Sequence, residues 1–106
     1  MKIKDMAGGK LYRTAFLVRK IENSGNEEWP ACTVTLSDAD QVQIQAIYRV
    51  AYNEQMEGLV GKPVEVIIQK GVIEGKDAYL VNKLKLAPEN IHAEDFLPQG
   101  KAGDAT

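Results

Sequence analysis

Residues 29–49 alternate apolar and polar side chains over two short runs, and this pattern constrains the fold more than any other part of the chain. The apolar phase of the two runs consists of Cys32, Val34, Leu36, Val42, Ile44, Ala46 and Tyr48. A period of two places one set of side chains in a core and the other towards water. Asp38 and Asp40 separate the runs, and aspartate side chains hydrogen-bond the backbone of turns. We therefore predict a β-hairpin with one buried face and one open face lined by Thr and Gln.

Residues 11–21 predict a long first strand that bends along its length. Phe16 lies on one phase of this strand, whereas Leu17 and Ile21 lie on the other. A strand shared between two sides of a small barrel buries different faces in its two halves, which accounts for apolar residues on both phases. Residues 22–28 have the composition of a loop, which would connect this strand to the hairpin.

The second half of the chain predicts a short helix followed by two strands. Residues 51–58 break the alternation, and Asn53 is a candidate cap for a helical turn there. Period-two patterns return at residues 64–70 and 77–86. The apolar phase of the last strand slips near Asn82, which predicts a β-bulge. With that bulge, the side chains expected to be buried are Tyr79, Val81, Leu84 and Leu86.

The order of three strands, a short helix and two strands describes an all-β fold, the five-stranded Greek-key barrel called the OB-fold. An SH3-like barrel is the main alternative, and it would lack the helix between strands three and four. A chain of 106 residues with 44% hydrophobic composition has room for one modest core. We expect an OB domain over residues 1–98 and a flexible tail over residues 99–106.

The charge balance and the single cysteine limit the classes of function. A net charge of −2 means that a protein binding nucleic acid through phosphates would need a local basic face. Cys32 is the one cysteine and lies on the apolar phase, which predicts a buried reduced thiol in a cytoplasmic protein. Neither a signal peptide nor an apolar run of the roughly 20 residues that a membrane span needs is apparent.

The side chains needed for catalysis or metal binding are sparse. His92 is the one histidine, so neither a metal cluster nor a catalytic triad has its parts. Cys32 has no base near it in the sequence, and turn chemistry accounts for Asp38 and Asp40. We therefore predict that this chain is not an enzyme and uses no cofactor or metal.

Short motifs spread over nearly the whole chain carry a family resemblance. They are residues 3–5 (IKD), 16–18 (FLV), 35–38 (TLSD), 44–46 (IQA), 61–64 (GKPV) and 94–98 (EDFLP). Together they resemble the OB domain at the amino end of bacterial 3′–5′ exoribonucleases that also carry a metal-binding HD domain. The resemblance implies that single-stranded RNA or DNA is held across strands two and three. The nuclease activity of those proteins is not carried over, because the HD domain is absent from this sequence.

Binding of single strands requires aromatic planes for the bases and cations for the backbone. Trp29, where the first loop meets the second strand, is the candidate platform, and capping of the barrel is the alternative role for its ring. The candidate cations are Arg13, Arg19, Arg49, Lys70 and Lys76, which would otherwise be ordinary solvated charges. The candidate hydrogen-bonding side chains on the open sheet face are Thr33, Thr35, Gln43 and Gln45.

Two functions remain open from the sequence. The first is a cytoplasmic OB module that binds single-stranded DNA or RNA, as an accessory to a larger machine. The second is an OB domain for contact with a protein partner or for self-association, without nucleic acid. The acidic net charge and the expected exposure of Ile47 and Ile67 favour the second.

Overall fold

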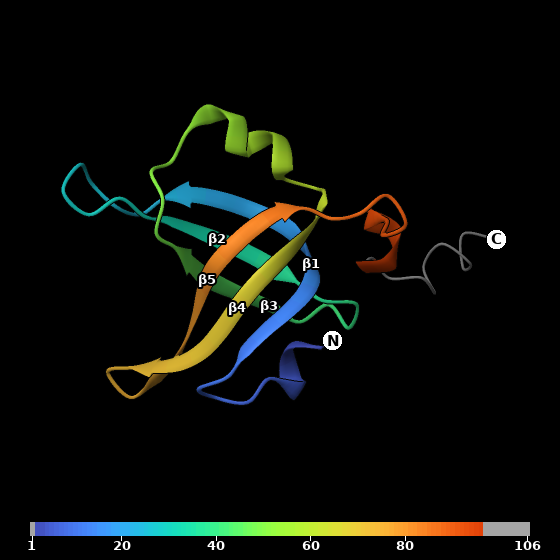
Figure 1. Cartoon of the computed structure of the whole chain (residues 1–106), viewed down its shortest axis with the longest axis horizontal. Helices are drawn as coiled ribbons and strands as arrows, with labels where there is room; N and C mark the ends of the chain where they lie inside the picture. Colours follow the sequence, from blue (N-terminus) through green and yellow to red (C-terminus); the bar gives the residue numbers. More distant parts are fainter. Residues whose placement is uncertain (1, 97–106) are drawn as a thin grey trace.

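The computed structural model describes residues 2–96, which form a closed barrel of five strands (Figure 1). The strands are β1 (Leu11–Asn23), β2 (Cys32–Ser37), β3 (Gln43–Tyr48), β4 (Pro63–Ile73) and β5 (Lys76–Leu86). Their order around the barrel is β1-β2-β3-β5-β4, and β4 pairs back with β1. The pairing of β3 with β5 is parallel, and the other pairings are antiparallel. This is the strand arrangement of an OB-like barrel, so the predicted fold class is confirmed.

Within the described residues, three short 3-10 helices accompany the barrel: η1 (Ile3–Asp5), η2 (Glu54–Leu59) and η3 (Ala93–Phe96). Figure 1 shows η2 and η1 on opposite sides of the barrel. No helix within residues 2–96 is long and apolar enough to cross a membrane. The expected domain boundary at residue 98 and the expected tail over residues 99–106 lie outside the described residues.

The alternating side chains of residues 29–49 pack as predicted except for Val42. The barrel core consists chiefly of Phe16, Val18, Ile21, Cys32, Val34, Leu36, Ile44, Ala46, Val64, Val66, Ile68 and Val81. Val42 does not join this core, because β3 begins only at Gln43 and Val42 belongs to the preceding turn.

Both predicted irregularities of the strands are present. In β1 the pairing with β2 shifts between Val18 and Lys20, and both Leu17 and Ile21 are buried. In β5 the pairing with β4 skips Asn82, which is therefore the bulged residue. The expected burial of Leu86 is wrong: this side chain at the end of β5 is 54% exposed.

The turn between β2 and β3 is built around Asp38, whose side chain is fully buried. Its Oδ1 accepts hydrogen bonds from the backbone N–H groups of Asp40 at 2.9 Å and Val42 at 3.1 Å. Its Oδ2 accepts the N–H of Ile3 at 2.7 Å. The predicted turn chemistry is therefore confirmed, and the same carboxylate also ties the N-terminal segment to the barrel.

The segment between β3 and β4 forms the expected short helix, but without the expected cap. Asn53 precedes η2 and its side chain makes no capping hydrogen bond. Met56 and Leu59 of η2 pack against the core instead, so burial of these two side chains holds the helix in place. Gly61 has φ of +86°, a conformation that glycine adopts without strain, and the chain reverses there into β4.

Candidate nucleic-acid interface

The β1–β2 loop, residues 24–31, is held in one conformation by its own hydrogen bonds. The N–H of Gly25 donates to the carbonyl of Ala31 at 3.0 Å, and the N–H of Asn26 donates to the carbonyl of Trp29 at 3.1 Å. The Asn26 Oδ1 accepts the N–H groups of Glu28 at 2.9 Å and Trp29 at 2.8 Å. The loop therefore presents Trp29 from a backbone that is largely pre-organised.

The indole of Trp29 is 73% exposed, so it does not cap the barrel core. It lines a surface hollow of about 480 Å³, here called the Trp29 hollow, with Pro30, Ala31, Ile47 and Arg49. Arg49 follows the last residue of β3 and is exposed. An exposed indole and a guanidinium thus border one hollow, which is the combination that base stacking and phosphate binding require.

The floor beside this hollow is the outer face of β2 and β3. Thr33 pairs with Ile47 and Thr35 with Gln45, while Gln43 pairs with Ser37, whose side chain is fully buried. The Gln43 and Gln45 side chains are exposed, whereas Thr33 and Thr35 are half-buried. The predicted polar face is therefore present, and it also includes the half-buried side chain of Ile47.

A second hollow of about 360 Å³ lies on the other side of Arg49. It is lined by Tyr48, Arg49, Val50, Leu80, Val81 and Asn82. Arg49 thus separates two hollows, and the surface continues from β3 to the bulge of β5. The sequence pattern predicts that bulge but not the proximity of Asn82 to Arg49, because the parallel β3–β5 pairing brings them together only in the closed barrel.

Arg13 lies on a different surface from Trp29. It pairs with Ile67 of β4, which pairs in turn with Lys83 of β5. Its Nη2 lies 3.2 Å from the Glu65 Oε1, and the Lys85 Nζ lies 3.4 Å from the same oxygen. The hydrogen bond from Arg13, with a further one from Lys85, holds the pKa of Glu65 below its usual value. Lys83 and Lys85, absent from the sequence-based set, are thus the cations grouped with Arg13.

The remaining candidate cations lie on two other elements. Lys70 of β4 has its Nζ 3.6 Å from the Asp77 Oδ2, and Lys76 is exposed at the start of β5. The β4–β5 hairpin and the β1–β2 loop project towards the same end of the molecule in Figure 1. Arg19 is exposed at the irregularity of β1. The structure therefore groups Arg49 with Trp29 and distributes the other four cations around the barrel.

The apolar surface differs from the expectation. Ile47 and Ile67 are half-buried, so they do not form the exposed patch that favoured a protein partner. Exposed large apolar side chains are found instead on the β4–β5 hairpin, where Val72 is 70% exposed and Ile73 is 49% exposed. Leu11, which pairs with Gln69 of β4, is exposed as well.

Cys32, the first residue of β2, carries a free and fully buried thiol. Its Sγ donates to the carbonyl of Val50 at 3.4 Å, and burial raises the pKa of the thiol.

The thiolate is the reactive form, so we expect the folded protein to react with a thiol-specific disulfide reagent far more slowly than the denatured protein. The absorbance of the released reagent gives both rates. Labelling of the folded protein at the denatured rate would contradict this burial.

Metal-binding side chains do not cluster in the part of the chain that the structure describes. Within residues 2–96, no group of three or more His, Cys, Asp or Glu side chains is placed to hold a metal ion.

Comparisons with known proteins give no family. No protein-family model matches this chain, and no curated protein matches it. The resemblance to the exoribonuclease OB domain therefore remains an expectation, and the functional argument depends on the surface geometry.

Proposed function

We propose that this chain is a binding module, not an enzyme, that holds single-stranded nucleic acid across the outer face of β2 and β3. The observation that carries the proposal is the exposed indole of Trp29 beside Arg49 at one hollow. Stacking of one base on an aromatic ring is worth about 1–3 kcal/mol, and arginine adds a planar cation for a base or a phosphate. The Thr and Gln side chains of the floor supply hydrogen bonds to bases and sugars.

The charge distribution predicts modest affinity that depends strongly on salt. Glu27 and Glu28 lie in the same loop as Trp29 and repel phosphates, while Arg49 is the one candidate cation at the hollow. We therefore propose that the module acts as an accessory to a larger machine, whose other parts contribute to holding the strand. The family resemblance supports this role, because it implies an OB domain that leaves the chemistry to a neighbouring domain.

Trp29 is the one tryptophan of the chain, so its fluorescence reports directly on the proposed stacking. A single-stranded oligonucleotide added at low salt is expected to quench this fluorescence. In an assay with a labelled oligonucleotide, Trp29→Ala should weaken binding about tenfold, and Trp29→Phe should weaken it less because the phenyl ring retains a stacking surface. Leu86→Ala is the matched control, because it removes another exposed apolar side chain that lines neither hollow. Absence of binding at low salt, or equal affinities for wild type and Trp29→Ala, would remove the proposal.

Arg49 should contribute through the phosphate backbone as well as through its planar group. For single strands, the logarithm of the affinity falls with the logarithm of salt concentration by about 0.7 per phosphate neutralised. Arg49→Ala should therefore reduce this slope by about 0.7, whereas Arg49→Lys should leave the slope unchanged and still lower the affinity. A slope that stays the same in Arg49→Ala would place the backbone contact elsewhere.

Protein contact or self-association is the second candidate function. The exposed Val72 and Ile73 side chains on the projecting β4–β5 hairpin favour it. Sedimentation of the wild type and of Val72→Ser separates the candidates, since an assembly built on the hairpin would dissociate in the variant and would not respond to oligonucleotide.

A further inference from the structure

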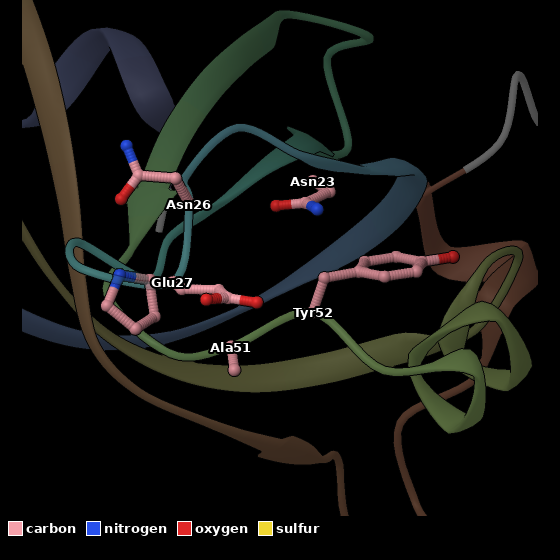
Figure 2. A pocket seen from close by; sticks show the side chains of 6 residues that line it. Asn23, Asn26, Glu27, Ala51 and Tyr52 are labelled. Carbon is pink, nitrogen blue, oxygen red and sulfur yellow. The ribbon is translucent and has the colours of Figure 1, made fainter.

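A second cleft lies against the β1–β2 loop, apart from the Trp29 hollow. Its volume is about 500 Å³, and it is lined by Asn23, Asn26, Glu27, Pro30, Ala51 and Tyr52 (Figure 2). We call it the Tyr52 cleft. Pro30 lines both this cleft and the Trp29 hollow, so the two sites flank the same loop. The Trp29 hollow and the Tyr52 cleft therefore share Pro30 as a common border.

Asn23 and Glu27 are the polar side chains of the cleft that offer free groups to a ligand beside Tyr52. The Asn23 Oδ1 accepts the N–H of Gly25 at 3.2 Å, which leaves the amide NH₂ of Asn23 to donate. The Glu27 carboxylate makes no hydrogen bond or ion pair with any other residue that the structure describes. Figure 2 shows the Glu27 carboxylate turned towards the base of the Tyr52 side chain and the Asn23 amide on the side of the Tyr52 ring. Asn26 also keeps its NH₂, since its Oδ1 accepts two backbone N–H groups of the loop, but Figure 2 shows its amide turned away from Tyr52.

The ring of Tyr52 forms a fixed wall of the cleft. It packs against the barrel core, and its hydroxyl donates to the Glu57 Oε2 at 2.6 Å. A tyrosine ring that packs against the core and has its hydroxyl hydrogen-bonded loses less conformational entropy when a ligand binds beside it. Ala51 beside it is small and leaves the cleft open.

The free groups of the cleft match the hydrogen-bonding edge of one base. A carboxylate accepts two hydrogen bonds side by side, and an amide NH₂ donates one. The Watson–Crick edge of guanine presents two adjacent donors, N1–H and N2–H₂, next to the O6 acceptor. Adenine, cytosine and thymine each present fewer donors to a carboxylate. The negative charge of Glu27 also disfavours a phosphate in this position, so the cleft suits a base and not the backbone.

We propose that the Tyr52 cleft is a guanine-selective subsite, in which Glu27 accepts N1–H and N2–H₂ and Asn23 donates to O6. This inference depends on the proposed binding of single strands, and it adds sequence selectivity to that binding. Glu27 then contacts guanine through two hydrogen bonds. Carboxylate and amide side chains discriminate between bases by such contacts in other protein–nucleic acid complexes.

The test uses oligothymidylates of about eight nucleotides, within the size that one OB domain covers, with a single central substitution. The substituted bases are guanine, inosine, adenine and cytosine, and inosine differs from guanine only in lacking the N2 amino group. The wild-type protein should bind the guanine oligonucleotide about tenfold more tightly than the inosine one. Glu27→Gln should abolish that difference. Glu28→Gln, the same charge change at the adjacent position outside the cleft, should retain it.

The other possible results distinguish failure of the guanine subsite from failure of the proposed single-strand binding. Equal affinity for guanine and inosine, with binding that still depends on Trp29, would overturn the guanine subsite and leave the proposed function standing. Loss of the preference in both glutamine variants would also overturn it, because charge and not the position of Glu27 would then be responsible. Absence of binding to every oligonucleotide at low salt would overturn the proposed function and this inference with it.

Discussion

Replacement of Asp38 by alanine is expected to lower the free energy of unfolding by about 3–5 kcal/mol. The fully buried carboxylate accepts the N–H groups of Ile3, Asp40 and Val42. Each donor left without a partner on burial costs about 1–3 kcal/mol, although donors near a turn regain part of this from water. Domains of this size have about 5–15 kcal/mol of stability, so the loss removes a large share of the total. Urea unfolding followed by circular dichroism measures it.

Asp40→Ala is the matched control for this experiment. The Asp40 carboxylate is 34% exposed, with its Oδ1 3.3 Å from the Lys2 Nζ and its Oδ2 3.9 Å from the Lys4 Nζ. Surface ion pairs contribute about 0–1 kcal/mol, so this variant should be nearly as stable as the wild type. Similar losses in the two variants would show that the three backbone hydrogen bonds of Asp38 are not what stabilises the turn.

Asp38 and Asp40 illustrate which parts of the fold the sequence specifies and which it does not. The alternation of Val34 and Leu36 with threonines specifies which face of β2 is buried, because a strand has a period of two. A polar break containing aspartate specifies a turn. The pattern does not say which of the two aspartates is buried, since that depends on the contact of Asp38 with Ile3, 35 residues away in the chain.

The candidate site was less predictable, for a reason that Arg13 and Arg19 illustrate. Strand phase distinguishes inside from outside but does not identify the neighbouring strand. Residues at the start of β1 pair with β4, and residues at its end pair with β2, so outward side chains of one strand lie on different sides of a closed barrel. Arg13 consequently joins Lys83 and Glu65 and not Trp29.

The Tyr52 cleft was not predictable from the sequence for a different reason. Residues 22–28 have an ordinary loop composition, and nothing in it distinguishes Asn23, which accepts one N–H of the loop, from Asn26, which accepts two. That distinction depends on backbone hydrogen bonds within the loop. Tyr52 comes from the opposite side of the cleft, on the segment that leads into η2.

The same loop geometry predicts a large effect of Gly25→Ala on the proposed binding. A Cβ on Gly25 would overlap the carbonyl oxygen of Trp29 and the backbone nitrogen of Ala31. Backbone atoms of a loop closed by its own hydrogen bonds cannot yield as a flexible side chain does, so the loop must open. Opening displaces Trp29 and separates the Trp29 hollow from the Tyr52 cleft. Loss of contacts at both sites should weaken binding of a guanine-containing oligonucleotide about a hundredfold.

Gly58→Ala is the control, because an added Cβ at Gly58 of η2 meets no atom within 4 Å. This variant should bind as the wild type does. In Gly25→Ala the emission and anisotropy of Trp29, the one tryptophan, should change even without oligonucleotide, while the circular dichroism of the barrel stays the same. If Gly25→Ala shows the tryptophan change but binds with wild-type affinity, a pre-organised β1–β2 loop is not what recognises the strand. If neither the tryptophan emission nor the affinity changes, the loop accommodates the methyl group, and its backbone is more flexible than its hydrogen bonds indicate.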